Sequence, residues 1–220
     1  MSIVKLVNMK VEYVDHMGSD INVVNAARVS FAKEVEDFDI EKDSKLINYL
    51  AKHNHWSPLA HTSVSIRIKA PIYMARQFVK HQIGLVWNEE SRRYIDDEPE
   101  FYVNQLRSKP VNAKQGSGDV LDSTSLYEDM IITHSQNSLD LYNRLLAGNV
   151  APEQARATLP QNVMTNWIWT GSLVALARVV KLRKDSHAQK EAQILAEMID
   201  DVVAPLYPVS WDALMEHMKV

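Results

Sequence analysis

The stretch from Lys80 to Tyr94, KHQIGLVWNEESRRY, places many hydrogen-bond donors close together on both sides of an apolar run. Lysine, histidine and glutamine open the stretch, and NEESRRY closes it. From Arg67 to Tyr94 six Lys or Arg residues stand against two Glu, whereas Asp96 to Glu100 contributes four acidic residues. This local excess of positive charge predicts a binding site for a small anion.

Three further arginines could serve the same ligand. Arg156 lies in QARATLP, and Arg178 and Arg183 lie in ARVVKLRKDSHAQ. Arg183 falls near the end of a predicted helix, where the helix dipole also favours a cation. Taken singly, each arginine is better explained as part of a solvated basic surface, so only their combination indicates a ligand site.

Three histidines, His53, His55 and His61, lie within HNHWSPLAH and resemble metal ligands. Zinc sites commonly include a cysteine or carboxylate, and this segment holds neither. We therefore expect no metal, and interpret the histidines either as packed or solvated side chains or as contacts to an organic ligand. A metal-dependent hydrolase built on these histidines is the alternative that this pattern leaves open.

Composition narrows the classes of protein. With 220 residues, 46% hydrophobic residues and only 6 Gly and 8 Pro, the chain can form a complete core, and we expect one domain over residues 1–220. The absence of cysteine excludes thiolate nucleophiles, disulfides and cysteine metal sites. No apolar run approaches the ~18 residues of a membrane span, and MSIVKLVNMKVEYVD is not typical of a signal peptide. We expect a soluble, cytoplasmic protein with no membrane partner.

The formal net charge of -4 argues against a nucleic-acid partner, because proteins that hold a polyanion usually carry a basic face. Arginine and aromatic residues nevertheless keep a single-stranded nucleic-acid module open as an alternative, through Trp87, Arg93, Tyr94 and Phe101.

Periodicity and capping residues predict the elements that must hold these groups. Helices are predicted from Ser19 or Asp20 through Phe31, over Ile40–His53, from Pro71 to about Gln82, from a Ser125–Glu128 capping box to about Ala147, from Pro152 to Pro160, over Ser172–Leu182 and over His187–Val203. Strands are predicted within Val4–Val14, over Thr62–Lys69 and over Val163–Gly171, and a surface loop over Arg107–Asp122. In the longest helix the expected core positions are Leu126, Met130, Leu139, Tyr142 and Leu146. Helices and strands interleave without a βαβ rhythm, which predicts an α+β fold with a mixed sheet flanked by long helices.

Several segments together resemble the flavin-dependent thymidylate synthases. NEESRRY, Asn88 to Tyr94, matches the end of that family's signature, and AARVSF, APIYMARQF, QARATLP and LRKDSHAQ are similar to family segments in the same order. The resemblance covers about residues 11 to 200. It implies the single α+β domain of that family and a homotetramer whose sites are shared between chains.

Three features depart from the family pattern. Lys80-His81-Gln82 stands where the family has Arg-His-Arg, and eight residues rather than seven separate this triplet from Ser91. Lysine is a point charge and glutamine is neutral, so the triplet lacks two guanidinium forks. Val174 stands where some members have an arginine that contacts the flavin.

The resemblance implies a role for each matched residue. Residues matched to dUMP binding are Gln77, Lys80, Glu89, Ser91, Arg93, Arg156 and Arg183. Of these, Arg183 is matched to the catalytic arginine at the pyrimidine edge, where a fixed cation would stabilise the negative charge that develops on the base. Residues matched to FAD are Ser30, His55, Ser57, Lys80, His81, Gln82, Asn88, Glu89 and Arg178, with Tyr94 also close to the flavin ring.

The implied reaction makes dTMP from dUMP. In the family NADPH reduces FAD, the flavin takes the methylene of methylenetetrahydrofolate, the carbon passes to C5 of dUMP, and the reduced flavin supplies hydride equivalents. This chemistry agrees with the absence of cysteine, because ordinary thymidylate synthases attack C6 with a thiolate. The altered triplet leaves one alternative in the same class, an enzyme that releases a hydroxymethylated pyrimidine nucleotide or acts on dCMP.

Overall fold

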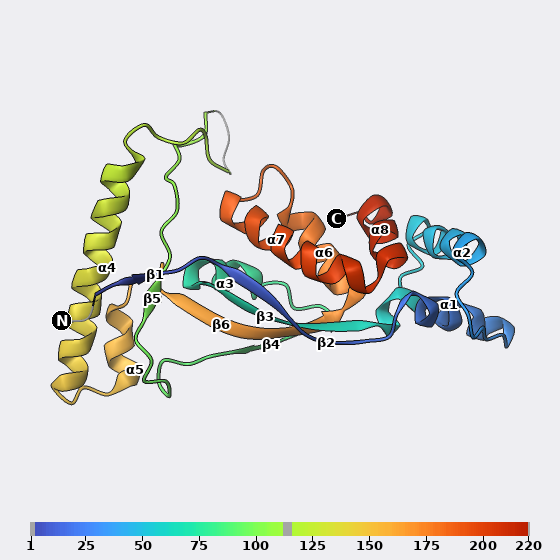
Figure 1. The fold of residues 1–220 in the computed structure, drawn as a ribbon, viewed down its shortest axis with the longest axis horizontal. Helices are drawn as coiled ribbons and strands as arrows, with labels where there is room; N and C mark the ends of the chain where they lie inside the picture. The colour runs from blue at the N-terminus through green and yellow to red at the C-terminus, as the bar shows by residue number, and fades with distance from the viewer. Residues whose placement is uncertain (1–2, 112–115, 220) are drawn as a thin grey trace. The chain divides into compact units, whose positions relative to one another are not determined.

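The computed structural model describes residues 3–111 and 116–219 of the chain (Figure 1). The chain divides into two compact units. The first unit comprises Met1–Lys10, Ile68–Lys80 and Asn88–Trp167, and the second comprises Val11–Arg67, His81–Trp87 and Ile168–Val220. Each unit is therefore assembled from segments that lie far apart in the sequence.

A four-stranded sheet has the strand order β2-β3-β6-β4. Its members are β2 (Lys10–Met17), β3 (Ser63–Pro71), β6 (Met164–Ser172) and β4 (Leu85–Glu89). In β3 the side chains of Val64, Ile66 and Ile68 are fully buried while the residues between them stay accessible, which confirms the predicted alternation. Together with the helices, this sheet confirms the predicted α+β class.

The first unit places helices around a buried hydrophobic cluster. Its elements are α3 (Ile72–Phe78), α4 (Thr124–Ala147), α5 (Pro152–Ala155), the 3-10 turn η3 (Arg156–Thr158), and the short parallel strands β1 (Lys5–Leu6) and β5 (Glu100–Phe101). The cluster contains Phe101, Leu139, Tyr142, Ala155 and Val163. Pro152 starts α5, as predicted, because proline is tolerated in the first turn. Arg156 follows directly and is therefore positioned by this core.

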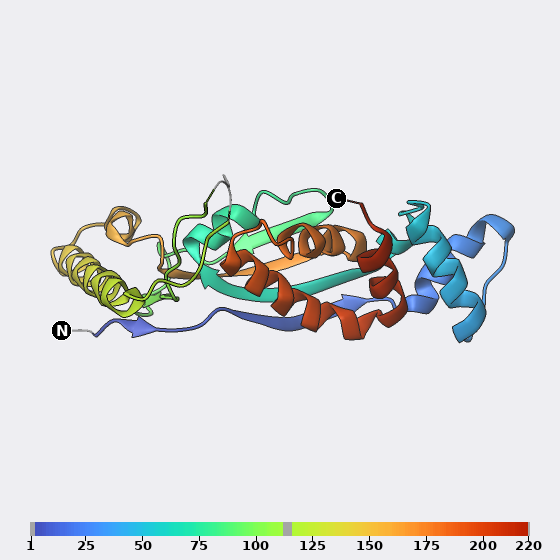
Figure 2. The ribbon, with the colours of Figure 1, turned by 90° about the horizontal axis from the view of Figure 1, so that it is seen from above.

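The second unit contains most of the helices. They are α1 (Asp20–Arg28), η1 (Val29–Phe31), α2 (Ile40–Lys52), η2 (Pro58–His61), α6 (Leu173–Arg183), α7 (Lys190–Val203), η4 (Ala204–Leu206) and α8 (Pro208–His217). Helix α6 packs against α7 and α8 (Figure 2). Ser172 caps α6, since its hydroxyl accepts a hydrogen bond from the Ala175 backbone at 3.3 Å. This cap and the packing fix the helix that carries Arg178 and Arg183.

The helix predicted from Pro71 to about Gln82 ends earlier, at Phe78. Gly84 has a φ of 76°, a left-handed conformation that favours glycine, and its carbonyl accepts a hydrogen bond from the Ser172 backbone at 3.1 Å. The chain therefore turns at Gly84 and continues as β4, which the sequence did not predict. As a result NEESRRY begins on a strand.

The predicted capping box of Ser125 and Glu128 is wrong. Helix α4 starts at Thr124 with Ser123 in the N-cap position, and Glu128 accepts a hydrogen bond from the Thr124 hydroxyl at 2.9 Å. Ser125 is the second residue of the helix, two positions past the N-cap Ser123, so it does not occupy the cap position.

The first half of α4 does not bury the residues expected in the core. Leu126 and Met130 are both 60% exposed, whereas Leu139 and Tyr142 are buried and Leu146 is partly buried against the hydrophobic cluster. Helical periodicity identifies an apolar face, but only packing decides which turns of that face are covered.

Three smaller differences concern the remaining elements. The helix predicted over His187–Val203 begins at Lys190, and α8 and β5 were not predicted. Inside the predicted loop Arg107–Asp122, Arg107 and Val120 form an antiparallel bridge, and residues 112–115 lie outside the described residues.

In the described ranges no helix has the length and apolar character needed to cross a membrane.

Candidate functional site

Two glutamates at the end of β4 are held by polar side chains of β6 in the first unit. Glu89 accepts a hydrogen bond from the Thr165 hydroxyl at 2.8 Å, and Glu90 accepts one from the Asn166 amide at 2.6 Å. The Glu90 backbone also donates to the Asn166 carbonyl at 2.9 Å. Strand pairing therefore fixes both carboxylates before any ligand binds.

A cavity of about 120 Å³ in the first unit brings Glu89 and Arg156 together. Its remaining lining residues are Ile72, Glu90, Arg92, Leu159, Val163, Met164 and Thr165. Arg156 enters from η3, where its Nε donates to the Glu153 carbonyl at 3.3 Å. Glu89 and Arg156 thus line one cavity, although 67 positions separate them in the chain. The resemblance had matched both residues to the same nucleotide.

Arg92 also lines this cavity, and sequence reasoning missed it. Its Nη1 donates to the Asp97 carbonyl, and its Nε is buried with no hydrogen-bond partner among the described residues. The signature pattern leaves the position between Ser91 and Arg93 open, so only its place in a basic run could have drawn attention to it.

Ser91, Arg93 and Tyr94 form a separate cluster in the first unit. The Arg93 Nε donates to the Ser91 hydroxyl at 3.2 Å, and the Arg93 guanidinium carbon lies 4.7 Å from the centre of the Tyr94 ring. Arg93 also lines a larger hollow of about 820 Å³, between residues 95–99 and α4. The structure therefore places Ser91 and Arg93 together, and Arg93 lines a hollow different from the cavity of Glu89 and Arg156.

The second unit joins two predicted site residues that lie far apart in the sequence. The Arg183 Nε, at the end of α6, donates to Nε2 of His81 at 3.0 Å. Burial, followed by the positive charges of Arg183 and Arg178, lowers the pKa of His81 to about 4. Burial also lowers the pKa of Arg183. His81 is therefore neutral at physiological pH. Arg178, which lies on α6 together with Arg183, is exposed.

The three histidines of HNHWSPLAH follow α2 in the second unit. The rings of His53 and His55 lie 4.3 Å and 5.9 Å from the ring of Tyr49, so these two histidines pack around one tyrosine. His55, Ser57 and His61 are exposed. Within the described ranges, no group of three His, Cys, Asp or Glu residues is placed to hold a metal ion.

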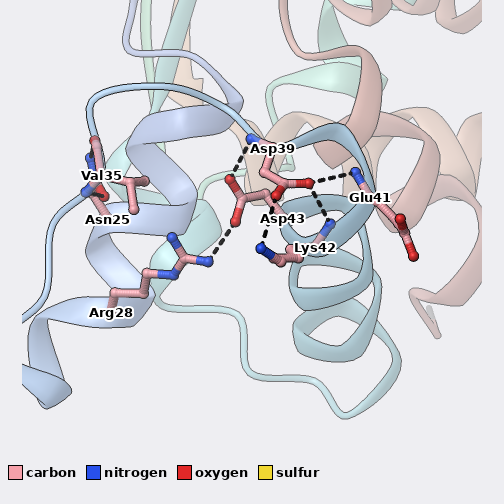
Figure 3. Close-up of polar contacts among 7 residues, drawn as sticks. All are labelled: Asn25, Arg28, Val35, Asp39, Glu41, Lys42 and Asp43. Carbon is pink, nitrogen blue, oxygen red and sulfur yellow. Dashed lines mark hydrogen bonds and ion pairs between the residues drawn. The ribbon is translucent and has the colours of Figure 1, made fainter.

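Ser30 lies in η1, at the end of α1, and is exposed. Its hydroxyl donates to the Ala27 carbonyl at 3.2 Å. Figure 3 shows what fixes this end of α1: Arg28 donates to the buried carboxylate of Asp43 at 2.6 Å. Asn25 additionally bonds the backbone of Val35 in both directions, at 2.9 Å each. The turn that carries Ser30 is thus tied to α2.

The remaining predicted residues lie on the surface or near it. Gln77 is half-buried on α3, and Lys80, Gln82 and Asn88 are exposed. The structure therefore groups the candidate residues into a set in the first unit and a set in the second unit, each built by its own core.

Comparison with known proteins identifies relatives along almost the whole chain. The family model described as thymidylate synthase complementing protein matches residues 12–209. A flavin-dependent thymidylate synthase of Thermosipho africanus is 38% identical over 206 residues, which cover 92% of this chain and 89% of that protein. The corresponding protein of Wolbachia pipientis wMel is 35% identical over 212 residues, covering 94% and 74%.

A solved structure has the same fold. It is the UMP/dUMP methylase PolB from Streptomyces cacaoi bound with 5-Br dUMP, which has a TM-score of 0.88 and 31% identity and covers 97% of each chain. The same methylase bound with 5-Br UMP gives a TM-score of 0.87 at 30% identity, covering 98% of each chain.

Proposed function

The chain belongs to the family of thymidylate synthase complementing proteins, and we propose that it is a flavin-dependent thymidylate synthase that converts dUMP to dTMP. Methylenetetrahydrofolate donates the carbon, and the cofactor is FAD, reduced by NADPH. The observation that carries the proposal is the family match over residues 12–209, within which Glu89 and Arg156 line one cavity.

The donors of the second unit suit FAD. Ser30, Ser57, His55 and Arg178 are exposed and present hydroxyl, imidazole and guanidinium groups, which match a pyrophosphate and ring carbonyl acceptors. When bound, FAD carries the one-carbon unit and supplies hydride equivalents, which amino-acid side chains cannot do. The protein residues then have to bind, orient and charge-stabilise the reactants.

We assign the nucleotide to the arginine, hydroxyl and carboxylate groups that the resemblance matches to dUMP binding. Arg156 in its cavity and the separate Ser91–Arg93 pair would both suit the phosphate, since charge-assisted bonds from arginine and hydroxyl groups suit a dianion. A site shared between chains would let both sets reach one nucleotide. Glu89, held by Thr165, would orient the nucleotide next to the flavin. Arg183 would stabilise the negative charge that develops on the pyrimidine as C5 becomes nucleophilic, so no covalent enzyme intermediate is needed.

We further propose a homotetramer with shared sites. The exposed apolar side chains of α4, with Leu126 and Met130 each 60% exposed, support burial against another chain. Light scattering should give four times the mass of one 25.1 kDa chain, and a fully active monomer would contradict the proposal.

Two further points stay predictions. Truncation tests whether residues 1–220 act as a single functional domain, and cell fractionation tests the cytoplasmic location.

The activity is tested by incubating the purified protein with dUMP, methylenetetrahydrofolate, NADPH and FAD. We expect dTMP by mass spectrometry, with formation dependent on all four components. A product heavier than dTMP by one oxygen, or turnover of dCMP alone, would show that the altered Lys80 and Gln82 mark the hydroxymethylating or cytosine-specific alternative.

The relative PolB favours one second candidate, methylation of UMP, because PolB is a UMP/dUMP methylase. A competition assay with equal UMP and dUMP separates the two. We expect dTMP to dominate, and equal formation of the ribonucleotide product would establish the broader specificity.

A further inference from the structure

His81 is the central residue of the Lys80-His81-Gln82 triplet, and it contacts the end of α6 within the second unit. The Arg183 Nε lies 3.0 Å from His81 Nε2, although 102 residues separate the two in the sequence. Lys80 and Gln82 are exposed, whereas His81 is half-buried. The histidine is therefore the member of the triplet that the fold turns toward Arg183.

The chemistry of the two groups fixes which is the donor and which is the acceptor in this hydrogen bond. A guanidinium can only donate, so His81 Nε2 must accept with its lone pair, and the imidazole proton resides on Nδ1. A protonated imidazole would place an N–H against an N–H. Burial and the charges of Arg183 and Arg178 hold the pKa of His81 at about 4, which keeps the ring neutral and the acceptor available.

Arg183 needs such an acceptor because it is the last residue of α6, and a long side chain at a helix end has many rotamers. A cation that stabilises developing charge is effective only when it is already oriented. Nε lies at the junction between the aliphatic stem and the guanidinium plane. A hydrogen bond at Nε therefore sets the orientation of that plane.

We propose that His81 is the positioning residue of Arg183, acting on the pyrimidine through the arginine. This inference rests on the proposed function, since it assigns Arg183 to the nucleotide. It also accounts for the triplet: Lys80 and Gln82 differ from the family's arginines, while the residue that contacts Arg183 is the histidine the family also has.

A double-mutant cycle on the FAD-loaded protein tests the inference. His81→Phe keeps a ring but removes the acceptor, and we expect kcat to fall about tenfold to a hundredfold, as for loss of a hydrogen bond to a charged group. His81→Gln keeps an acceptor and should recover most of that loss. In an Arg183→Lys background, which lacks Nε–H, His81→Phe should cost less than about twofold more. His187→Phe, at a histidine whose side chain is 81% exposed, is the matched control and should leave kcat unchanged.

Two results would overturn the inference. One is an equal loss from His81→Phe in both backgrounds. The other is full recovery of kcat by saturating FAD, with weakened FAD binding in fluorescence titration, which would make His81 a flavin contact only.

A measurement without turnover keeps the test independent of the proposed function. Nitrogen-15 NMR of the histidine ring should show a neutral His81 with the proton on Nδ1, and the Nε2 signal should shift in Arg183→Lys. An imidazole protonated on Nε2 would refute the contact even if the enzyme made dTMP. A protein that made no dTMP but showed the expected tautomer would refute the function instead.

Discussion

Replacing Asp43 with alanine should destabilise the protein far more than breaking an equally short ion pair on its surface. The Asp43 side chain is 1% exposed; one oxygen accepts from Arg28 at 2.6 Å and the other from the Asp39 backbone at 2.9 Å (Figure 3). Breaking a buried pair from one side costs about 3–5 kcal/mol, because the partner charge is left uncompensated. Arg28 is 23% exposed and can turn partly toward water, so we expect about 3 kcal/mol for Asp43→Ala.

Removing the other partner of the pair, Arg28, should lower the free energy of unfolding more than removing Asp43 does. Arg28→Met leaves a carboxylate that is 1% exposed with only the Asp39 N–H, for which we expect about 4 kcal/mol. The double variant should cost less than the sum, with a coupling of at least about 2 kcal/mol, because each change removes the same contact. Lys45→Met is the control: its pair with Glu41 is 2.7 Å long but 73% and 78% exposed, so we expect less than about 0.5 kcal/mol.

Urea unfolding followed by tryptophan fluorescence measures these differences, with the slope of the transition checked for each variant. If Asp43→Ala and Lys45→Met destabilise the protein equally, burial does not determine the worth of the pair and the reasoning fails. Arg28→Met should also weaken FAD binding, because Ser30 follows Arg28 by two residues in the adjoining turn.

Three further predictions concern individual groups. Arg183→Lys should lower kcat by about a hundredfold while changing dUMP affinity little, because an ammonium cannot follow two acceptors as a planar guanidinium does; equal losses in steady-state kinetics and calorimetry would mean that Arg183 only binds. Unfolding free energy should decrease as pH falls from 6.5 to about 4, because unfolded His81 takes up a proton in this range and folded His81 does not; His81→Gln should flatten this dependence in urea titrations, and an unchanged slope would contradict it. Asp20→Ala should cost about 2 kcal/mol, since its carboxylate accepts from the Val209 and Ser210 backbones at 3.0 and 2.9 Å and so caps α8; no change in thermal denaturation would refute this role.

This last contact explains why the sequence did not predict α8. A helix start is usually recognised from a capping side chain just before it, but Tyr207 in that position provides no side-chain cap. The capping carboxylate belongs to Asp20, 190 residues away from Ser210. By contrast α1, with Ser19 before it, and α2, with Asp39 before it, carry their caps locally, and both were predicted.

The same distinction applies to the candidate site. The resemblance identified Glu89 and Arg156 by their local motifs, and the structure places them in one cavity. Neither Arg92 in that cavity nor the bond between Arg183 and His81 could be predicted, because both depend on how distant segments fold together. A motif names the residue types, and tertiary packing decides which of them touch.

The charges of the first unit give a physical reason why an anion should be selected there. Although burial alone would raise it, the pKa of Glu100 is lowered by hydrogen bonds from Lys5 and Lys69, so this carboxylate is committed to a structural ion pair. Glu89 and Glu90 likewise accept hydrogen bonds from β6 side chains.

The arginines near them are bonded differently. Arg92 donates to the Asp97 carbonyl, Arg93 to the Ser91 hydroxyl and Arg156 to the Glu153 carbonyl. Neutral acceptors orient a guanidinium without cancelling its charge, whereas a carboxylate partner would compete with an incoming phosphate. The carboxylates of Glu89, Glu90 and Glu100 are thus hydrogen-bonded within the fold, while Arg92, Arg93 and Arg156 keep their full charge for a ligand. This local arrangement explains how a chain with a formal net charge of -4 can bind a nucleotide dianion.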